Sequence, residues 1–259
     1  YLLEAAGASA VALVGVGRLV QDLLLWCTME VGYLRLTDGF VQVSSIMPQK
    51  RNPVALEHAR ALASKAFAQA GAIPVAVHNT PFGDIVDTED DLQPLVANMF
   101  KDAVRAVSLV AVALEGADFD VEKMRRRAGE NWISVTELAD TLARERGLPF
   151  KAGHTIAAQL VRVRQDQPDA SLSDIVSQIS EEVTGTAITY TEDELATLLS
   201  PEHFVNIRKT HGGPSPEVTG AALEASRDSL GRDAGWIAST KTRLLNAEAA
   251  LKAATVAMG

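Results

Sequence analysis

The strongest constraint on the fold is a stretch without proline, from residue 2 to about residue 30, in which apolar residues recur three and four positions apart. That spacing places them on one face of a single α-helix. They are Leu13, Val16, Val20, Leu23, Leu24 and Cys27. A helix of roughly 29 residues would be ~44 Å long at 1.5 Å per residue. A rod of this length buries its apolar face against other long helices, so the pattern indicates a helical bundle.

Two more long helices are expected after the first. One runs from residue 54 to about residue 71, where a glycine and then a proline end the pattern. Asn52 is expected to cap this helix and Pro53 to be its first residue, because both residue types favour those positions. The other helix has an apolar face that repeats over residues 92–114. The acidic run at residues 84–91 between them is expected to be a solvated loop rather than a cation or polyamine site.

The chain changes character after residue 116, where shorter helices with clear ends follow. Residues 134–137 and 191–194 both fit the capping box that starts a helix. Gly147 is expected to close the first of these helices. A last helical stretch begins near residue 216 and is expected to be interrupted by three glycines.

These patterns predict an all-α protein, with a long-helix bundle followed by a small helical C-terminal domain. The expected division places the central bundle domain at residues 1–117 and the C-terminal domain, with its terminal helix, at residues 118–259. Short strands are expected only at residues 40–43, 75–77 and 187–191.

The formal net charge of −9 argues against a nucleic-acid surface, which needs a basic stripe to neutralise phosphates. An anionic substrate must therefore be held by local cations, and Lys50, Arg51 and Arg60 form such a group. The single cysteine, Cys27, has no partner for an intrachain disulfide and is expected to be a small core residue rather than a reactive thiol. The five histidines lack the spacing of metal ligands, so neither a metal nor another cofactor is predicted.

The ends and the apolar stretches of the chain bear on its location. No signal peptide is visible, and the charge-free stretch at residues 5–17 is too short to span a bilayer. We therefore expect a cytoplasmic protein without a membrane partner. The chain begins at Tyr1, inside a helical pattern and without an initiator Met, and we interpret it as the later part of a longer protein.

The segment with the clearest chemistry is the loop at residues 42–53. Its adjacent Ser44 and Ser45 are hydroxyl donors, Lys50 carries a positive charge, and the helix that follows offers free amide donors at its N-terminus. This arrangement is typical of a site that holds a carboxylate or another anion. On composition alone, the alternative is a serine-rich surface loop before an ordinary helix cap.

The full string resembles the signature loop of the fumarase/aspartase superfamily. It reads Ser44-Ser45-Ile46-Met47-Pro48-Gln49-Lys50-Arg51-Asn52-Pro53, with Glu57 shortly after. Within the superfamily, residues 47–50 are similar to the argininosuccinate lyase branch, although residues 50–53 also occur in adenylosuccinate lyases. Residues 18–26 resemble the helix before the loop in argininosuccinate lyases. The small C-terminal domain of argininosuccinate lyases is similar to this chain at residues 136–140, 147–150 and His154.

The resemblance implies a carbon–nitrogen lyase of the amidine-lyase type, which removes a proton beside a carboxylate of an N-substituted aspartate, expels an amine and leaves fumarate. It implies that Ser44 is the general base on a mobile loop, that Lys50 and Asn52 bind the carboxylate whose charge grows, and that Glu57 orients a histidine from another segment. It also implies a homotetramer whose active sites each draw on three subunits. Two of the active-site segments would lie upstream of Tyr1, so the chain alone is expected to be inactive.

Some positions depart from the pattern of argininosuccinate lyases. Val43 stands where the family has a glycine before the serine pair. In the stretch that helps to hold the arginine half of the substrate, His78 replaces a tyrosine and Asp91 replaces a lysine, while Asp90 is retained. Substrate contacts are expected from Ser45, Met47, Gln49, His78 and Asp90.

Because of these departures, more than one amine is considered as the group that the reaction releases. The first alternative is the same elimination on another N-succinyl amine, such as ethylenediamine-disuccinate or adenylosuccinate. The alternative of another class is a non-catalytic helical scaffold. The intact Ser44, Lys50 and Asn52 argue against a scaffold, because pure scaffolding would not need that loop.

Overall fold

The computed structural model describes residues 1–83 and 89–258. Ten α-helices contain most of these residues, and each strand in the described part has only two residues. The prediction of an all-α fold is therefore confirmed. The chain divides into two compact units, Tyr1–Met124 and Arg125–Gly259. The division expected after residue 117 stays a prediction, and most of the acidic run at residues 84–91 lies outside the described residues.

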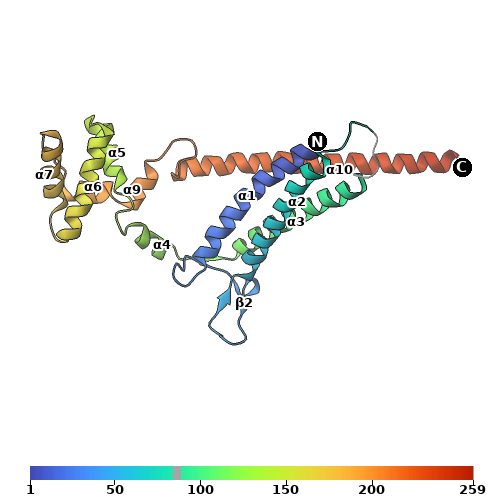
Figure 1. The fold of residues 1–259 in the computed structure, drawn as a ribbon, viewed down its shortest axis with the longest axis horizontal. Helices are drawn as coiled ribbons and strands as arrows, with labels where there is room; N and C mark the ends of the chain where they lie inside the picture. The colour runs from blue at the N-terminus through green and yellow to red at the C-terminus, as the bar shows by residue number, and fades with distance from the viewer. Residues whose placement is uncertain (84–88, 259) are drawn as a thin grey trace. The chain divides into compact units, whose positions relative to one another are not determined.

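The first unit is built from three long helices, α1 (Leu2–Trp26), α2 (Val54–Val77) and α3 (Glu89–Glu115). They run alongside one another in Figure 1, and α2 packs against both of the others. The buried face of α2 consists largely of alanines. These are Ala55, Ala59, Ala63, Ala66 and Ala70. Side chains this small let the backbones of α1 and α3 come close to α2 on its two sides.

The larger core residues gather towards the two ends of this helical layer. Val20, Leu23 and Leu56 are buried near the end at which α2 begins, and Ile73 and Met99 are buried near the other end. Complete burial of such a side chain contributes about 1.5–3 kcal/mol. This packing holds the first turn of α2 in a fixed place.

Two of the expected helix ends are wrong. The second helix does not stop near Gly71 but continues through Pro74 to Val77. Burial of Ile73 against α3 outweighs the cost of one glycine, which is about 1 kcal/mol in a helix. The first helix ends at Trp26 rather than near residue 30, and the hydroxyl of Thr28 donates to the carbonyl of Leu25 just past that end.

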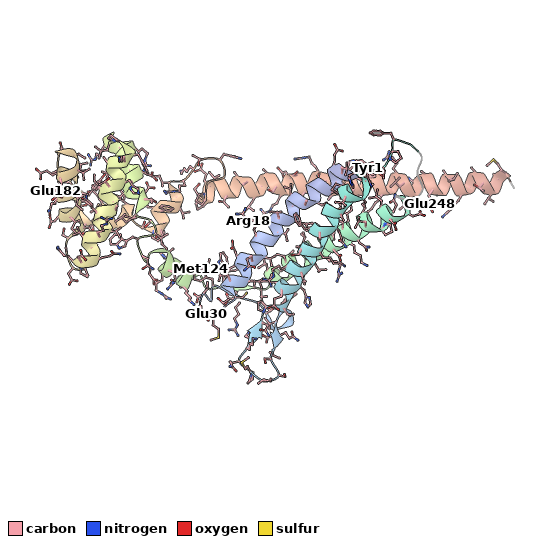
Figure 2. All side chains as sticks on the ribbon, viewed as in Figure 1. Tyr1, Arg18, Glu30, Met124, Glu182 and Glu248 are labelled. Carbon is pink, nitrogen blue, oxygen red and sulfur yellow. The ribbon has the colours of Figure 1, made fainter. Side chains whose placement is uncertain are left out.

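Two antiparallel strand pairs close the end of the unit at which α2 begins. Strand β1 (Leu34–Arg35) pairs with β4 (Asp118–Phe119), and β2 (Gln42–Val43) pairs with β3 (Arg51–Asn52). A short 3-10 helix, η1 (Asp38–Phe40), connects β1 to β2. Figure 2 places Glu30 and Met124 at this end of the helices and Tyr1 at the opposite end.

Three local predictions about this region and the strands fail. Pro53, not Asn52, is the N-cap of α2, because Asn52 belongs to β3 and its side chain does not cap the helix. The strand expected at residues 75–77 is the last turn of α2. The strand expected at residues 187–191 has no ladder partner in the described part of the chain.

The second unit is a cluster of short helices, entered through α4 (Val121–Ala128), which spans the division between the units. Its other short helices are α5 (Thr136–Arg146), α6 (Phe150–Asp166), α7 (Leu172–Thr184), α8 (Glu192–Leu198) and α9 (Pro201–Asn206). One core joins α5 to α8. Its fully buried members are Leu138, Leu142, Ile156, Leu160, Val176 and Leu195.

The caps of these helices were predicted in part. Thr191 forms the complete capping box with Glu194, as expected. Gly147 closes α5 in the left-handed conformation, with φ of 67°. The box expected at residues 134–137 is wrong, because α5 starts without a side-chain cap and the hydroxyl of Ser134 donates instead to the carbonyl of Leu199.

The last helix, α10 (Pro216–Met258), runs for 43 residues without the interruptions expected at its glycines. None of its residues is buried. One large apolar side chain nonetheless appears at every seventh position. The six are Leu223, Leu230, Ile237, Leu244, Leu251 and Met258, and they are 46–83% exposed.

Helix α1 is also notable for its composition. Among the described helices it is the one long and apolar enough to cross a membrane. A core helix of a bundle has the same composition, and Leu13, Val20 and Leu23 of α1 are buried. The prediction of no membrane partner stays a prediction.

Candidate functional site

The loop singled out from the sequence is the tip of a β-hairpin that projects beside the start of α2 (Figure 1). In its stem, Gln42 pairs with Asn52 and Val43 pairs with Arg51. The next positions in the same register are Ser44 and Lys50. The hairpin therefore brings the expected base and the expected cation to the two sides of its mouth, although six positions separate them in sequence.

The side chain of Ser44 is tied to the backbone of the loop. Its hydroxyl oxygen accepts from the amide of Ile46 at 3.2 Å and from the amide of Met47 at 3.1 Å. The amide of Lys50 donates to the carbonyl of Met47 at 3.0 Å. Two amide donors aimed at one oxygen favour negative charge on that oxygen.

The other loop positions are open to solvent. Ser45, Met47 and Gln49 are all exposed, and so is Val43 in the stem. Val43 lies in an extended strand, a conformation that any residue adopts. The replacement of the family's glycine at this position is therefore accommodated without backbone strain.

Arg51 fixes the stem of the hairpin to the segment before it. Its guanidinium Nη1 lies 2.6 Å from a carboxylate oxygen of Asp38, and its Nη2 donates to the carbonyl of Leu36 at 3.0 Å. Leu36 is itself buried in the core that anchors α2. A single side chain thus connects the hairpin, η1 and the core.

A hollow of about 640 Å3 lies at the foot of the hairpin. Four of the predicted site residues line it: Gln49, Lys50, Asn52 and Glu57. Its cations are Arg35, Lys50, Arg51 and Arg60, and its acids are Glu30 and Glu57. Even with Arg51 paired to Asp38, the three other cations exceed the two acids here, in a chain whose net charge is −9. Such a hollow suits an anion.

The N-terminus of α2 adds to this positive character. No side chain caps the helix there, so its first amides remain available as donors. Glu57 lies in the first turn, where the helix dipole favours a carboxylate. Arg60, one turn further on, donates to the side-chain oxygen of Gln21 on α1 at 3.1 Å.

Cys27 borders the same hollow and is half-buried. Burial raises the pKa of its thiol, which keeps the sulfur protonated near neutral pH. A thiol held protonated is a poor nucleophile. The position thus matches a structural cysteine better than a reactive one.

His78 and Asp90 lie away from the hairpin. His78 follows the last residue of α2, and its Nδ1 lies 2.7 Å from the carbonyl of Val75. Asp90 is exposed in the first turn of α3. The 24 residues of α2 extend for ~36 Å, which separates both residues from the hollow within one chain. The structure thus divides the predicted site residues into two groups.

Arg35 lines the hollow but was not predicted from the sequence as a site residue. The segment Leu34-Arg35-Leu36 alternates apolar, charged and apolar, and both leucines are buried while Arg35 is exposed. This alternation with a period of two is the signature of a half-buried strand. Read in that way, it would have placed Arg35 on the solvent side next to the loop.

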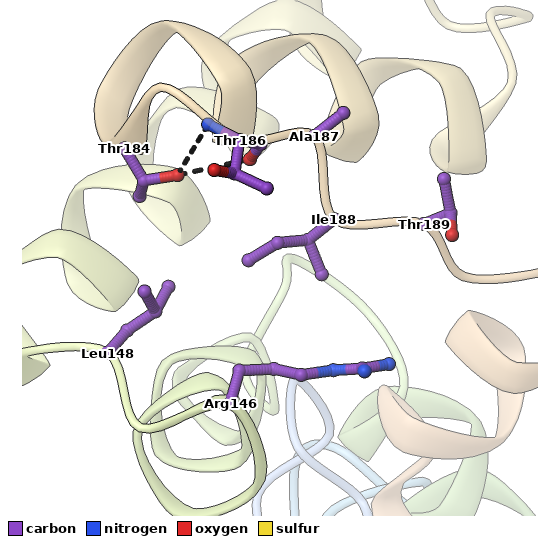
Figure 3. A pocket seen from close by; sticks show the side chains of 7 residues that line it. All are labelled: Arg146, Leu148, Thr184, Thr186, Ala187, Ile188 and Thr189. Atoms are coloured by element: carbon purple, nitrogen blue, oxygen red, sulfur yellow. Dashed lines mark hydrogen bonds between the residues drawn. The ribbon is translucent and has the colours of Figure 1, made fainter.

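A second hollow lies in the other unit and contains none of the predicted site residues. It has a volume of about 440 Å3, and Figure 3 shows Arg146 reaching below Ile188 on one side of it. The hydroxyl of Thr184 accepts from the amide of Thr186 and donates to its carbonyl. Of the seven residues that line this hollow, Arg146 is the charged one.

Among the described residues, acids, histidines and the cysteine form no group that could bind a metal. In residues 1–83 and 89–258 there is no group of three or more His, Cys, Asp or Glu side chains placed to hold an ion. The prediction that no metal is required stays a prediction.

Two family models match the chain. The first is described as "Lyase" and matches residues 1–68, which include the hairpin and the start of α2. The second is described as "Argininosuccinate lyase C-terminal" and matches residues 132–206, from a few residues after α4 to the end of α9. One match thus lies in each of the two units of the chain.

Curated relatives of the chain are named argininosuccinate lyases. The chain is 37% identical over 235 residues to "Argininosuccinate lyase 2" of Agrobacterium fabrum, covering 89% of this chain and 46% of that protein. It is 33% identical over 250 residues to an argininosuccinate lyase of Methanoculleus marisnigri, covering 95% of this chain and 50% of the relative. The chain thus spans about half the length of the curated relatives it matches.

Solved structures agree with this assignment. An EDDS lyase variant with bound fumarate superimposes with a TM-score of 0.79 at 28% identity, over 95% of this chain and 49% of the other. A class II fumarase of Schistosoma mansoni, at 17% identity and a TM-score of 0.54, shares the fold. The chain therefore belongs to the argininosuccinate lyase branch of the fumarase/aspartase superfamily.

Proposed function

We propose that this chain supplies part of the active site of a carbon–nitrogen lyase, which splits an N-substituted aspartate into an amine and fumarate. The observation that carries the proposal is the hairpin, which brings Ser44 and Lys50 to its mouth, next to a cation-rich hollow that Asn52 also lines. The printed names of the relatives, argininosuccinate lyase and EDDS lyase, support the same reaction class.

In this proposal Ser44 removes the proton. As an alkoxide it takes a proton from the carbon next to a substrate carboxylate, so that a C–H bond breaks and an O–H bond forms. The amides of Ile46 and Met47 stabilise the negative charge on the serine oxygen before the transfer. Closure of the exposed loop over the substrate would exclude water and strengthen these interactions.

Lys50 and Asn52 hold the carboxylate on which charge accumulates after proton removal. The free amides at the start of α2 add donors to the same region. Each donor aimed at the developing charge contributes about 3 kcal/mol, as deletions of oxyanion-hole donors show. Collapse of this dianion forms the carbon–carbon double bond of fumarate, and the C–N electron pair leaves with the amine. Glu57 would orient the histidine that another segment contributes.

The candidate substrates differ in the amine that the reaction releases. Argininosuccinate is the first candidate, because the curated relatives carry that name. Ethylenediamine-disuccinate is the second candidate, because EDDS lyase aligns over 95% of the chain and because His78 and Asp91 depart from the pattern that holds arginine. Adenylosuccinate is a third, weaker candidate.

A homotetramer with shared active sites is part of the proposal. The separation of His78 and Asp90 from the hairpin supports it, because residues at opposite ends of α2 meet only when different subunits contribute them. We further propose a cytoplasmic location, as for a soluble metabolic enzyme.

Fumarate release, followed by ultraviolet absorbance with the complete natural protein, tests the proposal. We expect Ser44→Ala to abolish release, because the proposal assigns proton removal to the Ser44 oxygen. Ser64→Ala, at an exposed position of α2, is the matched control and should keep full activity. Activity that survives Ser44→Ala would refute the role of Ser44. No fumarate from any candidate substrate would favour the scaffold alternative.

The reverse reaction identifies the amine. Fumarate is supplied with arginine, ethylenediamine or adenosine monophosphate in turn, and the adduct is measured by mass. A clear preference for arginine would show that the changes at His78 and Asp91 do not alter the amine pocket.

A further inference from the structure

We propose that Arg51 is a positioning residue, which sets the register of the hairpin stem by binding Asp38 and the carbonyl of Leu36, and so keeps Ser44 opposite Lys50. The proposal rests on the proposed function, because it assigns to Arg51 the task of placing the base of that reaction. We call the Arg51–Asp38–Leu36 contact the stem clamp.

The stem needs such a clamp because it is very short. Only two residue pairs join β2 to β3. A slip of one residue in a strand pair turns every side chain to the other face, and short strands with polar side chains define their register weakly. After such a slip Ser44 would no longer lie opposite Lys50, and its alkoxide would not meet the substrate held there.

The geometry of Arg51 differs from that of the other cations around the hollow. Its two terminal nitrogens are both engaged, at 2.6 Å with Asp38 and at 3.0 Å with Leu36. Lys50 and Arg35 have no side-chain partner among the described residues. The adjacent cations Lys50 and Arg51 thus have separate tasks. Lys50 is free for an anion, whereas the charge of Arg51 is neutralised within the chain.

The clamp also connects the hairpin to a rigid support. Leu36 is 3% exposed and packs in the cluster that includes Leu56 on α2 and Val20 on α1. Because the Leu36 carbonyl belongs to this anchored segment, the bond from Arg51 passes the rigidity of the helical core to the stem. The clamp acts on the stem and adds no contact of its own to the tip at residues 44–50.

The test compares Arg51→Gln, Asp38→Asn and the double variant in the complete natural protein. Each single variant should lower kcat by about tenfold to hundredfold with little change in KM, because the base is misplaced while the substrate cations remain. The double variant should be no worse than the worse single one, because both changes break the same contact. Arg51→Lys, which replaces the two-pronged contact with one donor, should be intermediate.

Glu202→Gln is the matched control. It breaks another exposed ion pair of 2.6 Å, between Arg125 and Glu202 in the second unit, and should leave kcat unchanged. Loss of kcat in Arg51→Gln with a normal Asp38→Asn would overturn the clamp, because Arg51 would then be acting on the substrate directly.

Amide hydrogen exchange supplies a readout that does not depend on catalysis. Arg51→Gln and Asp38→Asn should both speed exchange at residues 42–43 and 51–52, whereas Glu202→Gln should not. Unchanged exchange in both variants would refute the clamp even if the protein proved to be an active lyase. Faster exchange in a protein without lyase activity would support the clamp and refute the proposed function.

Discussion

Glu137 is a buried acid whose charge depends on its neighbours. Its side chain is 1% exposed in the second unit, yet it carries its charge between two arginines. Arg144 and Arg208 each donate to it at 2.8 Å, and the hydroxyl of Thr141 donates at 3.1 Å. Arg208 comes from the segment after α9, so this carboxylate ties that segment to α5.

Burial is the largest single influence on the pKa of Glu137 and raises it, because it favours the protonated form. The hydrogen bonds from Arg144, Arg208 and Thr141 lower the pKa, and together they outweigh burial. They hold the pKa of Glu137 below its ordinary value of 4.5. Its charged form therefore stabilises the folded state fully above pH 4.5. This stabilisation is lost as the pH falls from there through the lower pKa of the folded state.

We expect Glu137→Gln to destabilise the protein by about 2–4 kcal/mol near neutral pH, because it leaves two arginines without their shared partner. The partial exposure of Arg144 and Arg208 keeps the loss towards the lower end of that range. Urea unfolding at pH 7 and at acidic pH measures both effects. The variant should lose less stability than the natural protein on acidification, and Glu181→Gln, an exposed change on α7, should match the natural protein. An unchanged acid dependence would contradict this account.

At the scale of single residues, the sequence offered more about the loop positions than about their surroundings. Ser44 and Lys50 were predicted from a contiguous string, because a loop motif keeps its residues together, and their roles stay predictions. Arg35 lines the hollow beside the hairpin and Asp38 binds Arg51 of its stem, and only the fold reveals which loop they adjoin. The pairing of Arg51 with Asp38 depends on the strand register. The register of strands with only two residues cannot be predicted from a sequence pattern.

Among the elements, α5 and α6 make the closest contact that a single glycine explains. Gly153 on α6 is buried against the backbone of α5, where an added Cβ would lie 2.9 Å from the carbonyl oxygen of Ala139. It would also lie 3.3 Å from the Cα of Ala139. A backbone cannot move aside as a flexible side chain can, so this glycine sets the distance between the two helices.

Gly153→Ala should therefore destabilise the second unit by about 1–3 kcal/mol, the usual cost of overpacking. This loss opposes the gain that alanine normally brings to a helix. His154→Ala changes the neighbouring exposed position and should stay within about 0.5 kcal/mol of the natural protein. Thermal unfolding distinguishes the two, and equal stability of both variants would argue against a close α5–α6 contact.

The elements were predicted best where the apolar repeat was long. Helices α1 and α3 followed from their spacing, as did the capping box of α8. The end of α2 was missed because tertiary packing of Ile73 overrides Gly71, and propensity is only a weak guide against burial. Ser134 was misassigned because its hydroxyl bonds to Leu199, a partner 65 residues away.

At the scale of the whole molecule, helix α3 has a second apolar face, which is exposed and bears on subunit assembly. Phe100, Val104 and Val107 follow helical spacing and are 44–62% exposed, whereas Met99 and Val110 face the core of the unit. A helix that is apolar on more than one side is usually covered on both. This face agrees with the proposed tetramer, in which long helices of several subunits pack together.

Val104→Glu should reduce the tetramer to smaller species, because a charge would be buried without a partner in the helix contact. Molar mass from light scattering after size exclusion is the measurement. Asn98→Glu adds the same charge at an exposed position off that face and should leave the mass unchanged. A tetramer that survives Val104→Glu would place the subunit contact on other helices.

The spacing of the large side chains on α10 has a geometric consequence. A straight α-helix has 3.6 residues per turn, so positions seven apart drift by about 20° around the axis at each step. From Leu223 to Met258 five such steps occur, and the row of side chains winds around the helix by roughly 100°. A second helix that stayed in contact with all six would have to coil around α10 with a left-handed twist.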